Sequence, residues 1–588
     1  MRMPFYECAA QVRLGQHAAF DAWLYSLLMD NNIAYHMNPQ LIASPEQLGF
    51  MVCLAENQVY LPCSDAQFRC LQGRDIRTLR AQYAAIWRRT ARLVREITPQ
   101  EGRSLQLRFC SRRFRQAVHL GTILPTRLLK RMVSSALSTD DPWADPWKRR
   151  RQEASRRQRE LLESMVMRTA LDRLADGGDE HPAATDSLHQ AGRRLSGIAL
   201  VRHLCLALAG SRLAAAEPAP ETRGAAWLVE LFSRAERELA QARTVLQRVA
   251  EQGGTLLLLC DEEGGAVFDL ALARLCLQLG MRVIYAAKAG FCFMAPTLDD
   301  MEDDPELRGM IHADGIIRDS QLSKNALLRQ LRSHRLLVLD DGTREALNLH
   351  RVSVSFSRAW KEADLVLAKG KAAADILING SYEYTRDILC CWHTEDGLRC
   401  AFRPHAASVH KFSEQDITEK ADAIIAAMRA AHGQGQRVMF YSCIIGSIPG
   451  QTQTAIRLVR AFVDRLRRTM SHTLIINPAE HFMDGMDGDD LMYMWERVQR
   501  SGYIDIWRFQ TVEDIEESFA LLGERVPGVW LGKDATYSTG CTKEMRIALD
   551  MQTRNREMQI IGPEARMFMR RGEYGVGKYF DATIKGRY

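Results

Sequence analysis

Residues 253–270 read G-G-T-L-L-L-L-C-D-E-E-G-G-A-V-F-D-L, and this stretch decides the expected fold. The apolar run Leu256 to Cys260 is too short for a lone helix and follows a glycine pair, so it predicts a buried parallel strand. Three acids and a second glycine pair follow, and then a helix-period run from Ala266 to Leu279. Ligands of open α/β sheets bind beyond the carboxyl ends of the strands, so the stretch predicts a site there.

The residues that follow this strand are of types that bind a metal ion and an anion. Asp261, Glu262 and Glu263 supply the oxygen ligands that Mg²⁺ or Mn²⁺ prefers, and Gly264 and Gly265 permit close approach of the backbone. The free N–H groups of the following helix favour an anion at the same place. Taken alone, the stretch is equally compatible with a polar turn that leaves a core strand.

Composition excludes several classes of protein. The 588 residues predict three or four domains, and 46% hydrophobic with 26% charged residues is typical of a globular chain. A net charge of +6 is small for this length and does not imply a nucleic-acid partner. The 14 cysteines are scattered without a C-x-x-C pair, as in reduced cytosolic proteins. No leader-like or membrane-length apolar segment stands out, so we expect a cytoplasmic chain without a membrane partner.

The chain divides into three expected domains. Residues 1–223 form a helical domain that ends near Pro218 and Pro220, residues 224–410 an α/β domain, and residues 411–588 a second α/β domain. The arginine-rich part of the helical domain, residues 103–159, has few interleaved aromatic residues. An exposed basic helix face explains it better than nucleic-acid binding.

The middle domain alternates strands and helices, which predicts a doubly wound, mostly parallel sheet. The expected strands after the first are Arg282–Ala287, Arg335–Leu339, Asp364–Ala368 and Asp387–His393. Polar residues follow three of them and should converge at one sheet edge: Lys288, Asp340-Asp341-Gly342 and Lys369-Gly370-Lys371. An acidic loop containing Asp299 and Asp300 also follows the second strand.

Four segments resemble, in order, the metal-dependent damage-control phosphatases, a family with an acidic-residue methyltransferase-like fold. Its D-P-Y-x-x-x-K helix start is similar to Asp141-Pro142-Trp143 or Asp145-Pro146-Trp147, and its D-N-A-G-E-x-V-F-D motif resembles residues 261–269. Its acidic N-D loop resembles Asp299-Asp300, and its A-D-L-V-I-A-K-G signature resembles residues 363–370. The resemblance covers about residues 1–405 and leaves the last domain unrecognised.

The departures from the family pattern fall in the site itself. Glu262 stands where the family has a metal-binding asparagine, and Gly265 stands where it has a glutamate. Lys371-Ala372-Ala373 replaces the family's Q-G-N, and its G-N-x-x-D is represented at best by Gly210-Ser211. The resemblance therefore implies the fold more firmly than the catalysis.

The resemblance implies a phosphatase that hydrolyses small phosphate esters, such as damaged or excess phosphometabolites. It assigns a divalent metal (Mn²⁺, Mg²⁺, Co²⁺ or Ni²⁺) to Asp261, Glu262 and Asp300, and catalytic roles to Lys369 and Asp269. Substrate contacts would come from the following residues: Gly264, Gly265, Gly370, Lys371 and Lys288. The alternative is a catalytically degenerate regulatory protein that binds a phosphometabolite or nucleotide.

Two loops of the last domain suggest a second anionic ligand. Gly446–Thr454 and Thr536–Thr542 each join an expected strand to a helix, the second strand being Gly528–Leu531. Parallel strands would bring both loops to one sheet edge, where helix N-termini favour anions. Ordinary helix caps made of Ser, Thr and Gly explain these loops equally well.

Overall fold

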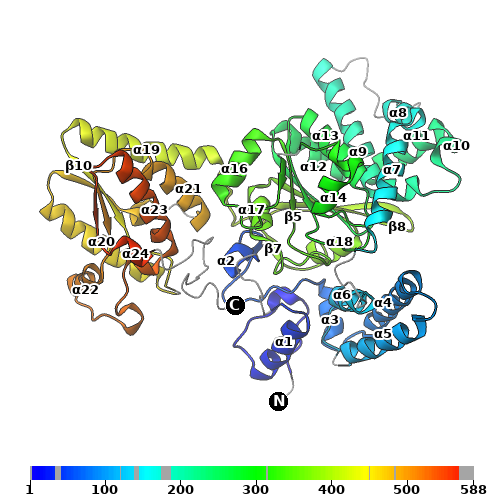
Figure 1. Ribbon diagram of the computed structural model, residues 1–588, viewed down its shortest axis with the longest axis horizontal. Coiled ribbons are helices and arrows are strands. Elements are labelled where there is room, and N and C mark those ends of the chain that lie inside the picture. Colours follow the sequence, from blue (N-terminus) through cyan, green and yellow to red (C-terminus); the bar gives the residue numbers. More distant parts are fainter. Residues whose placement is uncertain are drawn as a thin grey trace. The chain divides into compact units, whose positions relative to one another are not determined.

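The computed structural model describes residues 3–33, 42–119, 121–137, 145–173, 187–312, 315–448, 450–481 and 485–568. It divides into two compact units, Met1–Ala406 and Ala407–Tyr588 (Figure 1). Both units combine helices with mostly parallel sheets, so the predicted α/β class is confirmed. The alternative helix start at Asp141 lies outside the described residues.

The first part of unit 1 is helical. Its elements before the sheet are η1 Ala9–Gln11, α1 Ala18–Asp30, α2 Pro45–Leu48, β1 Val52–Cys53, α3 Asp65–Leu71, α4 Ile76–Ile97, α5 Arg103–Val118, α6 Pro125–Ala136, α7 Lys148–Glu163, α8 Met165–Asp172, α9 Leu188–Ala214, α10 Pro220–Arg223, α11 Ala225–Glu238 and α12 Ala240–Glu251. Strand β1 pairs with the distant β7 (Glu383–Tyr384), which ties the first residues of the chain to the sheet region.

The sheet region of unit 1 alternates strands and helices as predicted. Its further elements are β2 Thr255–Leu259, α13 Ala266–Gln278, β3 Arg282–Ala287, α14 Leu298–Asp303, α15 Pro305–Arg308, β4 Ile316–Ile317, α16 Lys324–Ser333, β5 Leu336–Asp340, α17 Val354–Glu362, β6 Leu365–Lys369, α18 Lys371–Leu377, β8 Asp387–Thr394 and β9 Gly397–Arg403. The strand order is β4-β5-β3-β2-β6-β8-β9, with every pair parallel except the last.

Burial on both faces explains why the central strands are continuously apolar. Leu256 and Leu258 join one core cluster with α9, α12 and α13, whereas Leu257 points to the opposite face and is equally buried. Helix α9, from the predicted helical domain, therefore belongs to the core of the sheet. For this reason residues 1–223 and the sheet region form one compact unit, without a division at 223/224.

Helix α9 is also the one described helix that is long and apolar enough to cross a membrane by length and composition. Within its apolar window, 67% is buried inside the protein. Packing against α12 and α13 accounts for this composition without a membrane. The helix is therefore typical of a core helix.

Unit 2 is a smaller parallel α/β fold. Its elements are α19 Glu414–Gly433, β10 Arg437–Ser442, α20 Thr452–Thr469, β11 Thr473–Ile476, η3 Pro478–Glu480, α21 Gly488–Gln499, β12 Ile506–Phe509, α22 Val512–Leu521, η4 Gly528–Trp530, η5 Ala535–Tyr537, α23 Thr539–Arg554, β13 Gln559–Ile561 and α24 Ala565–Phe568. All pairs in the order β11-β10-β12-β13 are parallel. From β10 the chain moves to β11 on one side and then to β12 on the other, so the strand order reverses between β10 and β12.

The strand predicted at Gly528–Leu531 is wrong. Residues 528–530 form the short 3₁₀ helix η4, in which Trp530 is buried while Val529 and Leu531 stay exposed. Pro527 before it lacks the N–H group that a sheet ladder needs. The consecutive apolar residues Val529, Trp530 and Leu531 therefore bury one tryptophan side chain and do not form a strand.

Close packing of α9 on α13 gives a stability prediction. A Cβ at Gly210 would lie 2.3 Å from the buried ring of Phe268, whereas a Cβ at Gly192 of the same helix meets nothing within 4 Å. We expect Gly210→Ala to destabilise the chain by about 1–3 kcal/mol through overpacking. Gly192→Ala should stabilise it by about 0.5–1 kcal/mol, as alanine does in a helix interior. Chemical denaturation of the full chain measures both; equal effects would contradict the packing.

Candidate functional site

The predicted site lies where the strand order of unit 1 reverses. After β2 the chain moves to β3 and β5 on one side, and it then returns to β6 on the other side of β2. Asp261 follows β2 and Gly370 follows β6, so both stand at the carboxyl ends of adjacent strands. In open α/β sheets this reversal creates the crevice in which ligands bind.

Gly370 allows the two strand ends to approach each other. A Cβ at this position would lie 3.3 Å from Asp261 Cβ and 3.4 Å from its Oδ2 atom, and Gly370 has a φ of 87°. Both the contact and the positive φ favour glycine over any residue with a side chain. The two motifs that carry the resemblance thus meet directly at Asp261 and Gly370.

Lys369 and Asp269 form a fully buried ion pair beneath this crevice. Lys369 Nζ lies 2.6 Å from Asp269 Oδ1, and both side chains have no solvent exposure. Lys369 also donates to Ala207 O of α9 at 3.1 Å, and Tyr285 Oη donates to Asp269 Oδ2 at 2.9 Å. The charge pair and its hydrogen bonds therefore connect two strands, β3 and β6, with two helices, α9 and α13.

The pKa values follow from burial and from this pairing. Burial raises the pKa of Asp269 to about 6, against the opposing effect of Lys369. Burial alone would lower the pKa of Lys369, but Asp261 and Asp269 together raise it, so the ammonium stays charged. Burial also raises the pKa of Asp261, while Lys369 opposes this shift. Lys369 therefore interacts electrostatically with both carboxylates, Asp261 and Asp269.

The glycine pair Gly264 and Gly265 makes room for neighbouring chain. Both have positive φ values, 85° and 94°. A Cβ at Gly264 would lie 2.8 Å from Met294 O, and one at Gly265 would lie 2.9 Å from Ser211 Oγ of α9. Both glycines therefore have packing roles in addition to any contact with a ligand.

The remaining predicted cations are paired within the protein. Lys288 is buried and donates to Asp341 Oδ2 at 2.6 Å and to Thr343 Oγ1 at 3.2 Å. Lys371 begins α18, where its Nζ lies 3.6 Å from Asp375 on the exposed helix surface. Neither lysine contacts Asp261 through a described hydrogen bond or ion pair.

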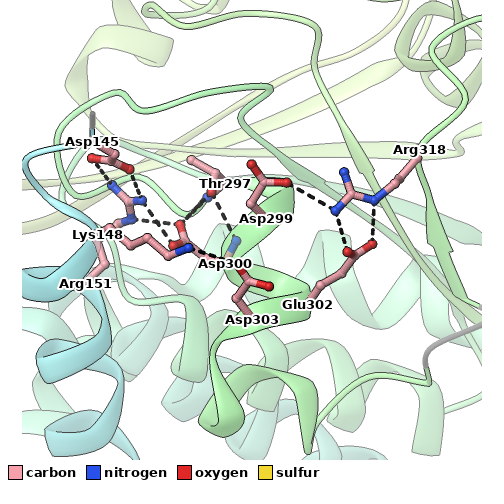
Figure 2. A network of polar contacts seen from close by, with 9 residues as sticks. All are labelled: Asp145, Lys148, Arg151, Thr297, Asp299, Asp300, Glu302, Asp303 and Arg318. Carbon is pink, nitrogen blue, oxygen red and sulfur yellow. Dashed lines mark hydrogen bonds and ion pairs between the residues drawn. The ribbon is translucent and has the colours of Figure 1, made fainter. Parts of the chain in front are cut away.

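Asp300 lies in a buried network that fixes the acidic loop (Figure 2). Its oxygens accept from Arg151 of α7 at 2.7 and 3.1 Å, and Arg151 also contacts Asp145. Asp300 Oδ2 additionally accepts from the backbone N–H of Thr297, which caps α14. At the rim, Lys148 pairs with Asp303, and Arg318 pairs with Asp299 and Glu302 (Figure 2).

The predicted three-carboxylate metal site is not assembled in this arrangement. The described part of the chain contains no group of three or more His, Cys, Asp or Glu side chains placed to hold a metal ion. The helix cap and Arg151 turn Asp300 toward α7, and Glu262 pairs with Arg89 of α4 at 3.1 Å. Asp261 and Glu262 remain adjacent acids after β2, where Asp261 Oδ1 accepts from the backbone N–H of Glu263 at 3.1 Å.

Sequence reasoning missed Arg151. The family motif places a lysine six residues after its aspartate, and Arg151 stands six residues after Asp145. Counting along that motif would have found this cation. No comparable signal points to Arg89, because its partner Glu262 lies 173 residues later in the chain.

In unit 2, the two loops predicted to bind an anion lie at one sheet edge, where Tyr537 of the second packs against the cluster that contains Ile448 of the first. Cys541 Sγ, at the start of α23, lies 3.4 Å from Cys443 O at the end of β10, and Ala535 N donates to Gln510 O just after β12. The second loop follows 3₁₀ helices, not a strand, and Lys543 pairs with Glu496. Residue 449 of the first loop lies outside the described residues.

Comparison with known proteins gives little further information. No family model matches the chain, and no curated protein matches it. Among solved structures, it is similar to a DUF89 family protein from Pyrococcus horikoshii, with 16% identity and a TM-score of 0.35 over 54% of this chain and 96% of that chain.

The buried ion pair predicts a pH-dependent stability change. Lys369→Met leaves the Asp269 carboxylate buried without its cation, which should cost about 3–5 kcal/mol at pH 8. Asp269 has a pKa raised to about 6, above its unfolded value, so its protonated form is favoured in the folded chain. Removing Lys369 raises this pKa further, so the variant's Asp269 takes up its proton at a higher pH than the wild type's, and the loss should shrink as the pH falls from 8 toward 6. Denaturation at pH 5 and pH 8 measures it.

The double variant Lys369→Met with Asp269→Asn is the control for this experiment. It removes both charges, so its stability should vary much less between pH 5 and pH 8 than that of the single variant. A loss in Lys369→Met that is the same at both pH values would contradict the pairing.

The Arg151 network predicts a contrast between neighbouring arginines. Arg151→Met leaves two carboxylates, one of them fully buried, without a cation and should cost about 3–5 kcal/mol. Arg150→Met breaks only the exposed pair with Glu96 and should cost at most about 1 kcal/mol. Chemical denaturation of both variants tests this contrast, and similar losses would argue against a structural role for the network.

Proposed function

We propose that unit 1 binds a small phosphate ester at the crevice between β2 and β6 and hydrolyses it with a divalent metal. The observation that carries this proposal is the meeting of two sequence motifs, with Gly370 against Asp261 and Lys369 paired with Asp269. The sequence resemblance to damage-control phosphatases supports the same reaction. The substrate would be a phosphorylated metabolite, and nothing in the site suggests a nucleic acid or a lipid.

The residues of the crevice divide the work of binding. Asp261 and Glu262 would hold the metal, which when bound polarises a phosphoryl group and lowers the pKa of a coordinated water. Lys369 favours the ionised form of Asp261 against the effect of burial, and Asp269 holds Lys369 in position. The start of α13 offers N–H groups to the phosphate. Arg89, half-exposed beside Glu262, is suited to contact a phosphate oxygen.

A second candidate function is binding without hydrolysis. Arg151 neutralises Asp300, and Glu262 replaces the asparagine of the family motif, so the site has fewer free metal ligands than the resemblance implies. A regulatory protein that senses a phosphometabolite or nucleotide would still bind this ligand in the crevice but would not hydrolyse it. Phosphate release distinguishes the two candidates.

We also propose that unit 2 binds a second anionic ligand between Gly446–Thr454 and Thr536–Thr542. The support is the meeting of the two loops beyond β10 and β12, where the strand order of the smaller sheet reverses. Helix α20 begins at this edge, and Ser538 caps α23 there. Lys543 pairs with Glu496. We therefore expect the anion to be bound by backbone N–H groups of the helix N-termini and not by this lysine.

Metal-dependent phosphate release tests the proposal for unit 1. With Mn²⁺, Co²⁺, Ni²⁺ or Mg²⁺, the full chain should release phosphate from at least one ester in a panel, and it should not do so after chelation. Asp261→Asn should lower kcat/KM by about 100-fold or more, because it removes a metal-binding charge. The matched control Asp303→Asn changes an exposed acid outside the crevice and should leave the rate unchanged. Equal rates for the wild type and Asp261→Asn would contradict the site.

A further inference from the structure

A cavity of about 400 Å³ opens beside Glu262, and the proposed reaction does not by itself explain it. Helix α6 forms one wall, and the segments that follow β3 and β5 form the others. Its size falls within the range of small-molecule pockets. It is lined by Thr126, Leu129, Lys130, Val133, Ser134, Leu137, Glu262, Phe291, Cys292, Phe293, Arg344, Glu345 and Ala346.

Most of the lining surface is apolar. Leu129 and Val133 of α6, and Leu137 just after it, recur at helical spacing and line the cavity together with Phe291 and Phe293. A sugar placed here would lose water from its hydroxyl groups and find few partners for them. A flat ring would bury apolar area and could pack edge-to-face on the phenylalanines.

Phe293, whose ring lines the cavity, has a strained backbone conformation. Phe293 has a φ of 55°, a left-handed conformation that side chains rarely adopt. Arg151 donates to its carbonyl at 3.2 Å, so the buried network around Asp300 also holds this residue. The Arg89 guanidinium lies 3.4 Å from the ring centroid, and Trp147 lies 5.2 Å from it. The ring is therefore fixed from several sides.

The charges at the cavity suit a monoanionic or dianionic ligand. Glu345 lies 3.5 Å from Lys130 and 3.7 Å from Arg127, and Glu262 pairs with Arg89. With Arg344 in the lining, four cationic side chains accompany two glutamates. Burial lowers the pKa of Lys130, and Glu345 opposes this shift. An anionic group near Glu262 would meet this surplus of positive charge.

We propose that the cavity binds the aromatic body of an aryl phosphate ester, with the phosphate at the end lined by Glu262, the residue after Asp261. That such an ester is hydrolysed rests on the proposed function of unit 1. That the aromatic group binds in this cavity does not depend on it. It names the substrate class as aromatic phosphate esters and assigns specificity to Val133, Phe291 and Phe293. The Arg151 network positions Phe293 without touching the ligand.

Titration calorimetry of the full chain with two phosphonates, which cannot be hydrolysed, tests this binding. Phenylphosphonate should bind at least about tenfold more tightly than methylphosphonate, because only the first fills the apolar cavity. Val133→Asn places an amide in the half-buried wall and should remove most of this preference. Leu105→Asn, an aliphatic-to-amide change at an exposed site on α5, is the matched control and should keep it.

The outcomes separate this inference from the proposed function. Equal affinities for the two phosphonates, binding of neither, or an unchanged preference in Val133→Asn would overturn the inference. If the phenyl preference holds and depends on Val133 but no ester is hydrolysed, the inference stands and the proposed reaction fails. If sugar phosphates are hydrolysed as fast as phenyl phosphate in both wild type and Val133→Asn, the reaction stands and the inference fails.

Discussion

One buried ion pair, between Lys369 and Asp269, holds the site of unit 1 together. A lysine at the end of β6 and an aspartate in the first turn of α13 would each be costly to bury alone, and together they are tolerated because each compensates the other. The same ammonium contacts Ala207 O of α9 and supports the ionised form of Asp261. The sheet, its first helix and the helical region are thus aligned by one charge pair, and the crevice between β2 and β6 lies directly above it.

Internal cations shape the rest of the site. Arg151 occupies the two oxygens of Asp300, and Arg89 pairs with Glu262, so the acidic edge is largely neutralised by arginines of the helical region. Arg151 also holds the strained Phe293 at the neighbouring cavity. One consequence is that Asp300 and Glu262, two of the three metal ligands that the resemblance implies, are paired with arginines. The other is that Phe293, which Arg151 of the network in Figure 2 contacts through its carbonyl, is held in place where the proposed aryl group would bind.

Much of the fold could be predicted from the sequence because its signals are local. Strands β2, β3 and β6 are apolar on both faces, and their predicted bounds agree with the structure to within a residue. Strand β9 was missed because, at the sheet edge, it is only partly buried and has two arginines. The ligand role of Asp300 could not be tested from sequence, since the arginine that takes its carboxylate lies 149 residues earlier. The helices and strands around the site could thus be predicted from the sequence, but the ion pairs between residues far apart in the chain could not.

The most direct test of the account is a crystal structure of the full chain with Mn²⁺ and phenylphosphonate, in which anomalous scattering locates the metal. The account predicts Mn²⁺ about 2.1 Å from an Asp261 oxygen, as for a hard divalent ion, with the phosphonate oxygens on the metal and the phenyl ring among Val133, Phe291 and Phe293. The pair of Arg151 with Asp300 should remain intact. A metal bound to Asp300 with Arg151 displaced, or a phosphonate away from Asp261, would contradict it.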